Sequence, residues 1–288
     1  MTSYLKHLKF LLFLFLVACA APQPTSNIDT ILENFHDANS EYVMVTAHRA
    51  AHKIHPENSL PAIKHSISLG IDIVELDVKT TKDNIPVLMH DVSGINRTTN
   101  GSGKVEDYTL EELKKFRLIN PDGTLSEETI PTFEEALNLI HGNIMVDVDL
   151  KTDNVKPIVE MVKKTETQKY VFYYNNNYNI LKEVLNLDEN AMLMPYASSY
   201  EMADSALNLF SPEVVHINPS FYSLKVSSSI TYNKARIWIN ALGDTDAMIR
   251  EGKTGEAMDK LLLYKANIIQ TDEPEIVLSY LISKGLHN

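Results

Sequence analysis

Two acidic side chains lie close together on one predicted strand. Apolar and charged residues alternate over residues 73–78 with the period of a β-strand, which places Glu75 and Asp77 on the same face. Like charges at this separation are costly to bury unless a cation lies between them. Ligands that are all oxygen suit a hard ion such as Ca2+ or Mg2+. The stretch therefore predicts a site for one divalent cation.

A histidine follows on a second apolar run. Residues 85–91 end in His90 and Asp91 and come directly after a polar turn. Two runs separated by so few residues are typical of a β-hairpin rather than of a crossover connection. An even number of residues in the hairpin loop would place His90 opposite Asp77 or Glu75. In either register the imidazole shares a face with both carboxylates, which puts a titratable group beside the metal site.

Strand and helix patterns alternate along the rest of the chain. A helix predicted at residues 59–69, capped by Asn58 and ended by Gly70, separates two strands that we therefore expect to be parallel. Apolar strand runs begin near residues 43, 72, 144, 170, 192, 214, 236 and 267. Eight strand and helix units in 288 residues are typical of an α/β fold, the (β/α)8 TIM barrel. We expect the hairpin and a surface insertion, residues 93–131, between the second and third parallel strands.

Polar residues gather where these strands end. In a TIM barrel, catalytic groups lie at the C-terminal ends of the strands. The residues at or just beyond such ends are His48, Arg49, Glu75, Asp77, Asp149, Lys151, Asn240 and Asp272. Asp147, Asp149 and Lys151 alternate with apolar residues, so a second strand also presents its charges on a single face. The sequence thus predicts one catalytic centre at that end of the barrel.

The N-terminus has the features of an export signal. Lys6 and Lys9 precede an apolar run over residues 10–17, which is too short for a permanent membrane span. The only cysteine of the chain, Cys19, follows in a setting that resembles a bacterial lipobox. We expect a lipoprotein signal peptide over residues 1–18, lipidation of Cys19, and a membrane-anchored protein of the cell envelope, in the periplasm or at the outer membrane. A plain signal peptide before an incidental cysteine is the alternative.

Charge and composition limit the partners. The formal net charge is −12, and loss of residues 1–18 removes two lysines and no acid, which gives −14. A surface this acidic repels phosphate backbones and argues against a nucleic-acid partner. One cysteine allows no intrachain disulfide. We expect a tether and a short helix over residues 19–40 and a single barrel domain over residues 41–288.

An ordered set of short motifs resembles a known family. The motifs are, in chain order, His48 and Arg49; residues 56–59; Glu75, Leu76 and Asp77; residues 81–83; His90 and Asp91; Arg97, Thr98, Thr99 and Gly101; Trp238 and Asn240; and Thr271, Asp272 and Pro274. Together they resemble the glycerophosphodiester phosphodiesterase family, over nearly the whole mature chain. The resemblance implies a phosphodiesterase TIM barrel that hydrolyses glycerophosphodiesters to sn-glycerol 3-phosphate and an alcohol.

The resemblance also implies roles for individual residues. Its metal ligands are Glu75, Asp77 and Asp149. Its general acid and base are His48 and His90. The chemistry of the reaction agrees, because a phosphodiester is anionic and its hydrolysis needs charge neutralisation as well as two proton transfers. Imidazole gains and loses a proton near neutral pH, which suits both transfers.

The same resemblance assigns the substrate contacts. Arg49 and Lys151 are expected to hold the phosphate. Trp238 is either a residue of the barrel core or a contact of the substrate alcohol. Two positions depart from the family pattern. Ala50 stands where glycine is usual, and Asp149 stands where glutamate is usual, so one methylene less affects the identity and tightness of the metal site.

Three functions fit these patterns. The first is metal-dependent hydrolysis of glycerophosphodiesters, a small-molecule substrate class. The second, on the same barrel, is a phospholipase-type phosphodiesterase activity on lysophospholipid or phosphoinositide headgroups. The third is a lipoprotein that binds phosphodiesters without cleaving them. A binding protein has no need for two histidines, His48 and His90, beside a metal, so this pair favours an enzyme.

Overall fold

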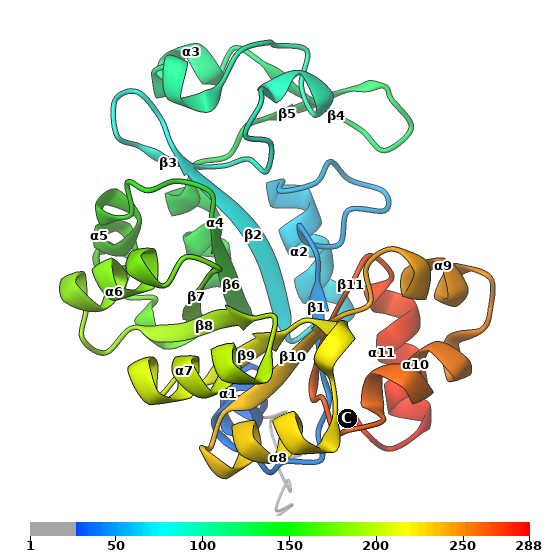
Figure 1. Cartoon of the computed structure of the whole chain (residues 1–288). Coiled ribbons are helices and arrows are strands. Elements are labelled where there is room, and N and C mark those ends of the chain that lie inside the picture. The colour runs from blue at the N-terminus through cyan, green and yellow to red at the C-terminus, as the bar shows by residue number, and fades with distance from the viewer. Residues whose placement is uncertain (1–26) are drawn as a thin grey trace, which may run out of the picture.

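Eight parallel strands close into a barrel in the computed structural model, which describes residues 27–288 (Figure 1). In the order in which they lie side by side, the strands are β1 (Met44–Ala47), β2 (Ile73–Thr80), β6 (Met145–Leu150), β7 (Val171–Asn175), β8 (Met192–Ala197), β9 (Val214–Ile217), β10 (Arg236–Asn240) and β11 (Ile268–Thr271). Parallel pairing of β1 with both β2 and β11 closes the ring. The predicted (β/α)8 TIM barrel is confirmed. The predicted signal peptide and Cys19 lie outside the described residues.

Helices surround the barrel. They are α2 (Leu60–Leu69), α4 (Phe133–Ile140), α5 (Lys156–Lys164), α6 (Tyr178–Leu187), α7 (Tyr200–Phe210), α8 (Leu224–Tyr232), α9 (Asp244–Arg250), α10 (Thr254–Leu262) and α11 (Pro274–Ser283), with short 3-10 turns η3 (Gln168–Tyr170) and η4 (Pro219–Phe221). The cap of α2 is Ser59, whose hydroxyl accepts from the Ala62 amide, and Gly70 ends the helix at φ +76. The predicted cap Asn58 is wrong by one residue. No helix within residues 27–288 is long and apolar enough to cross a membrane.

The hairpin forms, but its register differs from the expectation. Strand β3 (Pro86–Leu88) runs antiparallel to β2, with Thr80 opposite Pro86, so the loop holds five residues. With an odd loop, Met89 rather than His90 faces Asp77, and the Met89 amide donates to the Asp77 carbonyl at 2.9 Å. His90 lies beyond the end of β3. The alternation of side chains along a strand, from which we expected His90 to face the carboxylates, therefore does not determine its orientation.

A small subdomain follows β3 and lies over the extended end of β2 (Figure 1). Its elements are η1 (Ile95–Arg97), η2 (Val105–Asp107), α3 (Leu110–Leu113), β4 (Arg117–Ile119) and β5 (Leu125–Thr129). It has an apolar core of its own, which includes Ile95, Val105, Leu113 and Leu118. The β4–β5 hairpin was not predicted from the sequence. We call residues 93–131 the insertion below.

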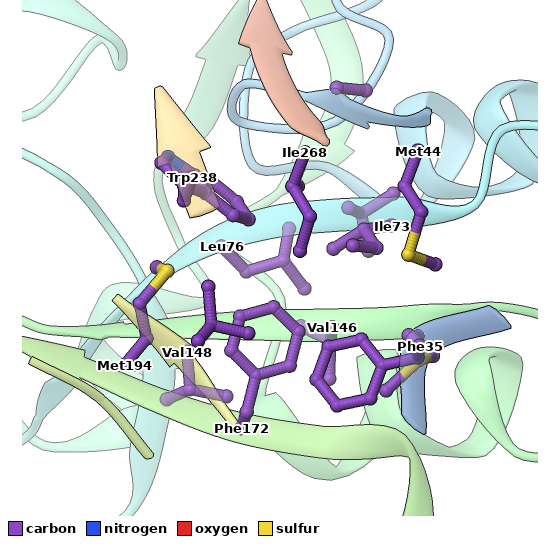
Figure 2. Close-up of a cluster of buried hydrophobic side chains, with 14 of the residues drawn as sticks. Phe35, Met44, Ile73, Leu76, Val146, Val148, Phe172, Met194, Trp238 and Ile268 are labelled. Carbon is purple, nitrogen blue, oxygen red and sulfur yellow. The ribbon is translucent and has the colours of Figure 1, made fainter. Parts of the chain in front are cut away.

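Helix α1 (Asn27–His36) lies in Figure 1 at the end of the barrel away from the insertion. Its Phe35 is 1% exposed and packs on Phe172 inside the barrel, with 5.2 Å between ring centroids (Figure 2). The guanidinium of the buried Arg236 ties this end together, because it donates to four backbone carbonyls, those of Asn34, Asp37, Tyr42 and Asn267. The short helix expected within residues 19–40 is thus present as α1, and Ile28, Ile31 and Phe35 on it belong to the barrel core.

Candidate active site

Two neighbouring strands bring the acidic residues together. In the parallel pairing of β2 with β6, Glu75 lies opposite Asp147 and Asp77 opposite Asp149. One oxygen atom from each of Glu75, Asp77 and Asp149 lies within 4.8 Å of the other two. Glu75 and Asp77 are 2% and 1% exposed. The strand register therefore assembles the three expected metal ligands into one buried cluster.

The electrostatics of this cluster favour a cation. Burial, together with the charges of Asp77 and Asp149, raises the pKa of Glu75 well above its usual value. Burial also raises the pKa of Asp149 to about 6, although Lys151 opposes the shift. Lys151 Nζ lies 2.5 Å from Asp149 Oδ2 and 3.3 Å from Asp77 Oδ1, and one ammonium leaves an excess of negative charge. An all-oxygen donor set with this charge and burial fits Ca2+ or Mg2+.

Asp77 is fixed by a residue whose role was not predicted. Asn58 donates through Nδ2 to Asp77 Oδ2 at 2.7 Å, and its Oδ1 accepts from the Asp77 amide at 3.1 Å. Asn58 is buried and adopts φ +53, a left-handed conformation that asparagine tolerates better than most residues. Asn58 therefore orients a ligand carboxylate.

His48 is held by a carboxylate from the far end of the chain. It follows β1, and its Nδ1 lies 2.8 Å from Asp272 Oδ1, just beyond the neighbouring strand β11. This contact leaves Nε2 facing the acidic cluster, 4.0 Å from Glu75 Oε2. Burial would raise the pKa of Asp272, but the hydrogen bond and charge of His48 outweigh burial and lower it. Asp272 is therefore a hydrogen-bond partner of His48.

His90 has a carboxylate partner as well. Its Nδ1 lies 2.8 Å from Asp91 Oδ1. Arg97, from the insertion, donates to both oxygens of Asp91 at 2.7 and 2.8 Å, and lowers the pKa of Asp91 to about 2. A carboxylate on one ring nitrogen fixes the orientation of the imidazole and leaves the other nitrogen for proton transfer. Both histidines thus have the support that acid–base catalysis requires.

Arg49 lies between the cluster and a second ion-pair group. One terminal nitrogen donates to both oxygens of Glu57 at 3.1 Å, and Nε lies 3.7 Å from Asp77 Oδ2. Nε is buried and has no hydrogen-bond partner among the described residues, which leaves a donor for an anion. Arg49 and Ala50 have φ values of +51 and +62. A left-handed conformation at position 50 is one that glycine adopts with less strain than alanine, as the expected glycine at this position implies.

The pocket between the strand ends has a volume of about 120 Å3. Its walls are His48, Glu75, Asp77, His90, Asp147, Asp149, Lys151, Tyr174, His216, Asn240, Leu242 and Gln270. Trp238 is fully buried and is not a wall of this pocket; it donates through Nε1 to Asn240 Oδ1 at 2.8 Å. The indole therefore contacts a wall residue, Asn240, without lining this pocket itself, and a contact of Trp238 with the substrate stays a prediction.

Several of these walls were missed in the sequence. Asp147 was placed on the correct face of its strand but was given no role, and Gln270 lies two residues before Asp272, so strand alternation would have found it. Tyr174 lies on β7 and His216 lies on β9, and no motif in the sequence singled out either residue. Burial lowers the pKa of His216 to about 3, which keeps its imidazole neutral. The inner surface of the barrel thus carries polar residues in addition to the predicted ligands.

Residues 48–206 match the model of the glycerophosphoryl diester phosphodiesterase family, which is more than half of the chain. The chain belongs to this family. It is 28% identical over 257 residues to the glycerophosphodiester phosphodiesterase of Caldanaerobacter subterraneus subsp. tengcongensis, a match that covers 84% of this chain and 98% of that protein. It is an enzyme of the phosphoric diester hydrolase class.

Solved structures of the family share the barrel. The glycerophosphoryl diester phosphodiesterase of Parabacteroides distasonis is 26% identical, with a TM-score of 0.77 over 90% of this chain and 93% of that one. A phosphodiesterase of Oleispira antarctica, solved with the product sn-glycerol-3-phosphate, is 24% identical, with a TM-score of 0.68 over 83% of this chain and 96% of its own. The second likeness concerns the fold alone.

Proposed function

We propose that this protein hydrolyses glycerophosphodiesters to sn-glycerol 3-phosphate and an alcohol, with one divalent cation as cofactor. One observation carries the proposal. Three buried carboxylates, Glu75, Asp77 and Asp149, share a pocket with two histidines whose Nδ1 atoms each contact a carboxylate. The names of the relatives, including the Caldanaerobacter enzyme, support the same substrate class.

The phosphate needs positive charge around it. A bound Ca2+ or Mg2+ at Glu75, Asp77 and Asp149 would neutralise negative charge on the nonbridging oxygens as a Lewis acid. The free Nε donor of Arg49 is directed toward this cluster, and Glu57 holds the other end of the guanidinium in place. Lys151 lies against the same carboxylates and supplies a second cation.

The two histidines carry the proton transfers in this proposal. One imidazole takes a proton from the attacking hydroxyl group, and the other gives a proton to the oxygen of the leaving alcohol. His48 and His90 reach the pocket from different segments, after β1 and after β3, so they approach the phosphorus from separate directions. Asp272 and Asp91 stabilise whichever imidazole is protonated at a given step.

Product analysis tests the activity. The metal-loaded protein is incubated with glycerophosphodiesters of several alcohols, and sn-glycerol 3-phosphate is measured with an assay specific for that enantiomer. We expect one sn-glycerol 3-phosphate for each alcohol released. The His90→Ala protein is the control for contaminating hydrolases. Release of glycerol with a phosphomonoester of the other alcohol, or no release, would contradict the proposal.

We further propose that the mature protein is a lipoprotein of the cell envelope, anchored through Cys19. The support is the apolar run over residues 10–17 followed by this lone cysteine. Expression of the full chain in a bacterium and separation of membranes from soluble fractions tests it. We expect membrane association that Cys19→Ala abolishes. Equal membrane recovery of the Cys19→Ala protein, cleaved at the same bond, would overturn the assignment.

A further inference from the structure

A groove of about 980 Å3 opens beside the catalytic pocket. It lies between η2 of the insertion and the two barrel loops after β6 and β7, residues 152–154 and 175–177. We propose that this groove, here called the alcohol groove, binds the leaving alcohol of the substrate and selects an uncharged, polyhydroxylated one. The inference rests on the proposed phosphodiesterase function and adds to it the class of alcohol.

The position of the groove matches that of a substrate arm. Asp149, Lys151 and Tyr174 line both the groove and the catalytic pocket, so the two spaces adjoin each other. The catalytic pocket, at about 120 Å3, is small for a phosphate with both of its substituents. The groove lies within the range of about 300–1,000 Å3 that is usual for small-molecule sites. A phosphodiester with its phosphorus at the acidic cluster would extend one substituent into the groove.

The charges along the groove largely cancel. Lys79, which is 2% exposed, lies 2.6 Å from Glu106 Oε1 of η2, and Lys151 is paired with Asp149. Lys79 is buried and paired, so it offers no free charge to the alcohol, and Lys151 lies at the border with the catalytic pocket, where the proposed function directs its charge to the phosphate. The remaining charged groups are solvated and of both signs. The groove therefore lacks the buried, unpaired charge that would select a cationic or an anionic headgroup.

Its free hydrogen-bonding groups are amides instead. The side chain of Asn176 makes no hydrogen bond with any described residue. Asn177 accepts from the Asn179 amide and keeps both of its own N–H donors. Asn154 donates to Asn84 and keeps its carbonyl oxygen. An amide offers donors and acceptors together, which matches the hydroxyl groups of a polyol.

An acyl chain would fit this surface poorly. Val92, Leu150 and Ile180 are the aliphatic residues among the walls, and the other walls are polar or are tyrosine. Burial of a hydrocarbon against amides and ion pairs gains little hydrophobic free energy and costs hydration of the polar groups. The groove therefore favours a sugar alcohol or an inositol over a lysophospholipid.

The experiment compares four diesters with wild-type protein: glycerophosphoinositol, glycerophosphocholine, the methyl ester of glycerophosphate, and a lysophosphatidylcholine. We expect kcat/KM for glycerophosphoinositol to exceed that for each of the others by about tenfold, since two extra hydrogen bonds of average strength give a factor of that order. A preference for the choline ester or for the lysolipid, or equal values for the inositol and methyl esters, would overturn the proposal.

A variant locates the preference in the groove. Asn176→Leu removes an amide that supports no other residue, and we expect a three- to tenfold lower kcat/KM for the inositol ester with an unchanged value for the methyl ester. Asn190→Leu, an exposed asparagine at the other end of the barrel before β8, is the matched control and should change neither value. An unchanged ratio in Asn176→Leu would place the selectivity elsewhere.

Failure of the proposed function would look different. If the protein hydrolyses none of the four diesters, the phosphodiesterase proposal fails. Calorimetric titration of the metal-loaded protein with the inositol and methyl esters then still measures the affinity of the groove for the alcohol. Tighter binding of the inositol ester that Asn176→Leu weakens would support the alcohol groove, and equal affinity for the two esters would refute it.

Discussion

At the scale of single residues, the two histidines are supported in the same way by residues of different origin. Asp272 comes 224 positions after His48, whereas Asp91 is the direct neighbour of His90. Each contact is 2.8 Å and involves Nδ1, so each ring presents Nε2 to the pocket. The arrangement suits a pair in which one imidazole acts as the base and the other as the acid.

We expect His48→Ala and His90→Ala each to lower turnover by about a hundredfold or more, because each removes a proton-transfer group. Calcium or magnesium affinity should change little. The double variant should lose less than the product of the two single losses, since the residues act as a unit. Steady-state kinetics with a glycerophosphodiester, together with calorimetry for the ion, measure these effects. Full activity in either single variant would remove that histidine from the mechanism.

The acidic cluster should make metal affinity depend on pH. Burial raises the pKa of Asp149 to about 6 and that of Glu75 well above its usual value, so acidification of the ion-free protein protonates these carboxylates, and a proton competes with the ion. We expect weaker Ca2+ or Mg2+ binding at pH 5.5 than at pH 8 by calorimetry, and weaker binding in Asp149→Asn without loss of the fold. A chelator should abolish activity and the ion restore it. Hydrolysis that persists in chelator, with no metal by elemental analysis, would refute the site.

At the scale of elements, the insertion is fastened to the barrel by ion pairs on both sides of the site. Arg97 of η1 donates to both oxygens of Glu57, in the loop after β1, at 2.8 and 2.6 Å. Glu106 of η2 holds Lys79 at the end of β2. Since Glu57 also binds Arg49, the position of the insertion bears directly on a residue expected to contact phosphate.

We expect Arg97→Ala to lower kcat/KM by about tenfold, because Asp91 and Glu57 lose the partner that positions them and small misplacements near the reacting atoms are costly. Arg117→Ala, another insertion arginine whose partner Glu127 is exposed, is the matched control and should be near wild type. Steady-state kinetics measure kcat/KM of the two variants, and limited proteolysis measures how firmly the insertion is held. Equal activity of the two variants would show that the ion pairs of Arg97 with Asp91 and Glu57 do not affect catalysis.

At the scale of the whole molecule, the end of the barrel opposite the pocket is closed by both ends of the described chain. The buried Asp72 accepts from the Tyr42 hydroxyl at 2.8 Å and from the Val45 amide at 2.8 Å, and it lies 2.9 Å from His287 Nε2. Residue 287 is next to the C-terminus, so the last turn of chain is tied to the strands. Helix α1 lies at this end of the barrel as well.

This network predicts a pH-dependent stability. Burial opposes protonation of His287, but Asp72 outweighs burial and raises the pKa of His287 above 6.5. The contribution of the protonated ring is therefore complete below the unfolded value near 6.5 and is lost as pH rises through the higher folded value. We expect His287→Phe to lower the unfolding free energy by about 1–3 kcal/mol at pH 6 and by less at pH 9.

Urea unfolding at the two pH values measures the difference. His141→Phe, which changes an exposed histidine, is the control and should give the same stability as wild type at both. A loss in His287→Phe that is as large at pH 9 as at pH 6 would assign the effect to packing against Tyr42, whose ring centroid is 4.4 Å away, and not to charge.

Local periodicity allowed much of this protein to be predicted from its sequence. A strand turns successive side chains to opposite faces, so Glu75 and Asp77 had to share one face wherever the strand lay. The number of strand and helix units predicted the barrel, and the barrel predicted that His48 and Asp149 would lie at one end. Such inferences hold because they depend on neighbours in the chain.

Tertiary structure decided how these faces meet. The register of β2 against β6 sets Asp149 beside Asp77, and ring closure sets Asp272 beside His48, although neither pairing has a local signal. The odd hairpin loop sets Met89 opposite Asp77, and β3 ends at Leu88, so the orientation of His90 does not follow from strand alternation. Asn58 bonds Asp77 only because the loop after β1 folds back on β2. Contacts of this kind depend on how separate strands pack together, and chain periodicity does not encode that packing.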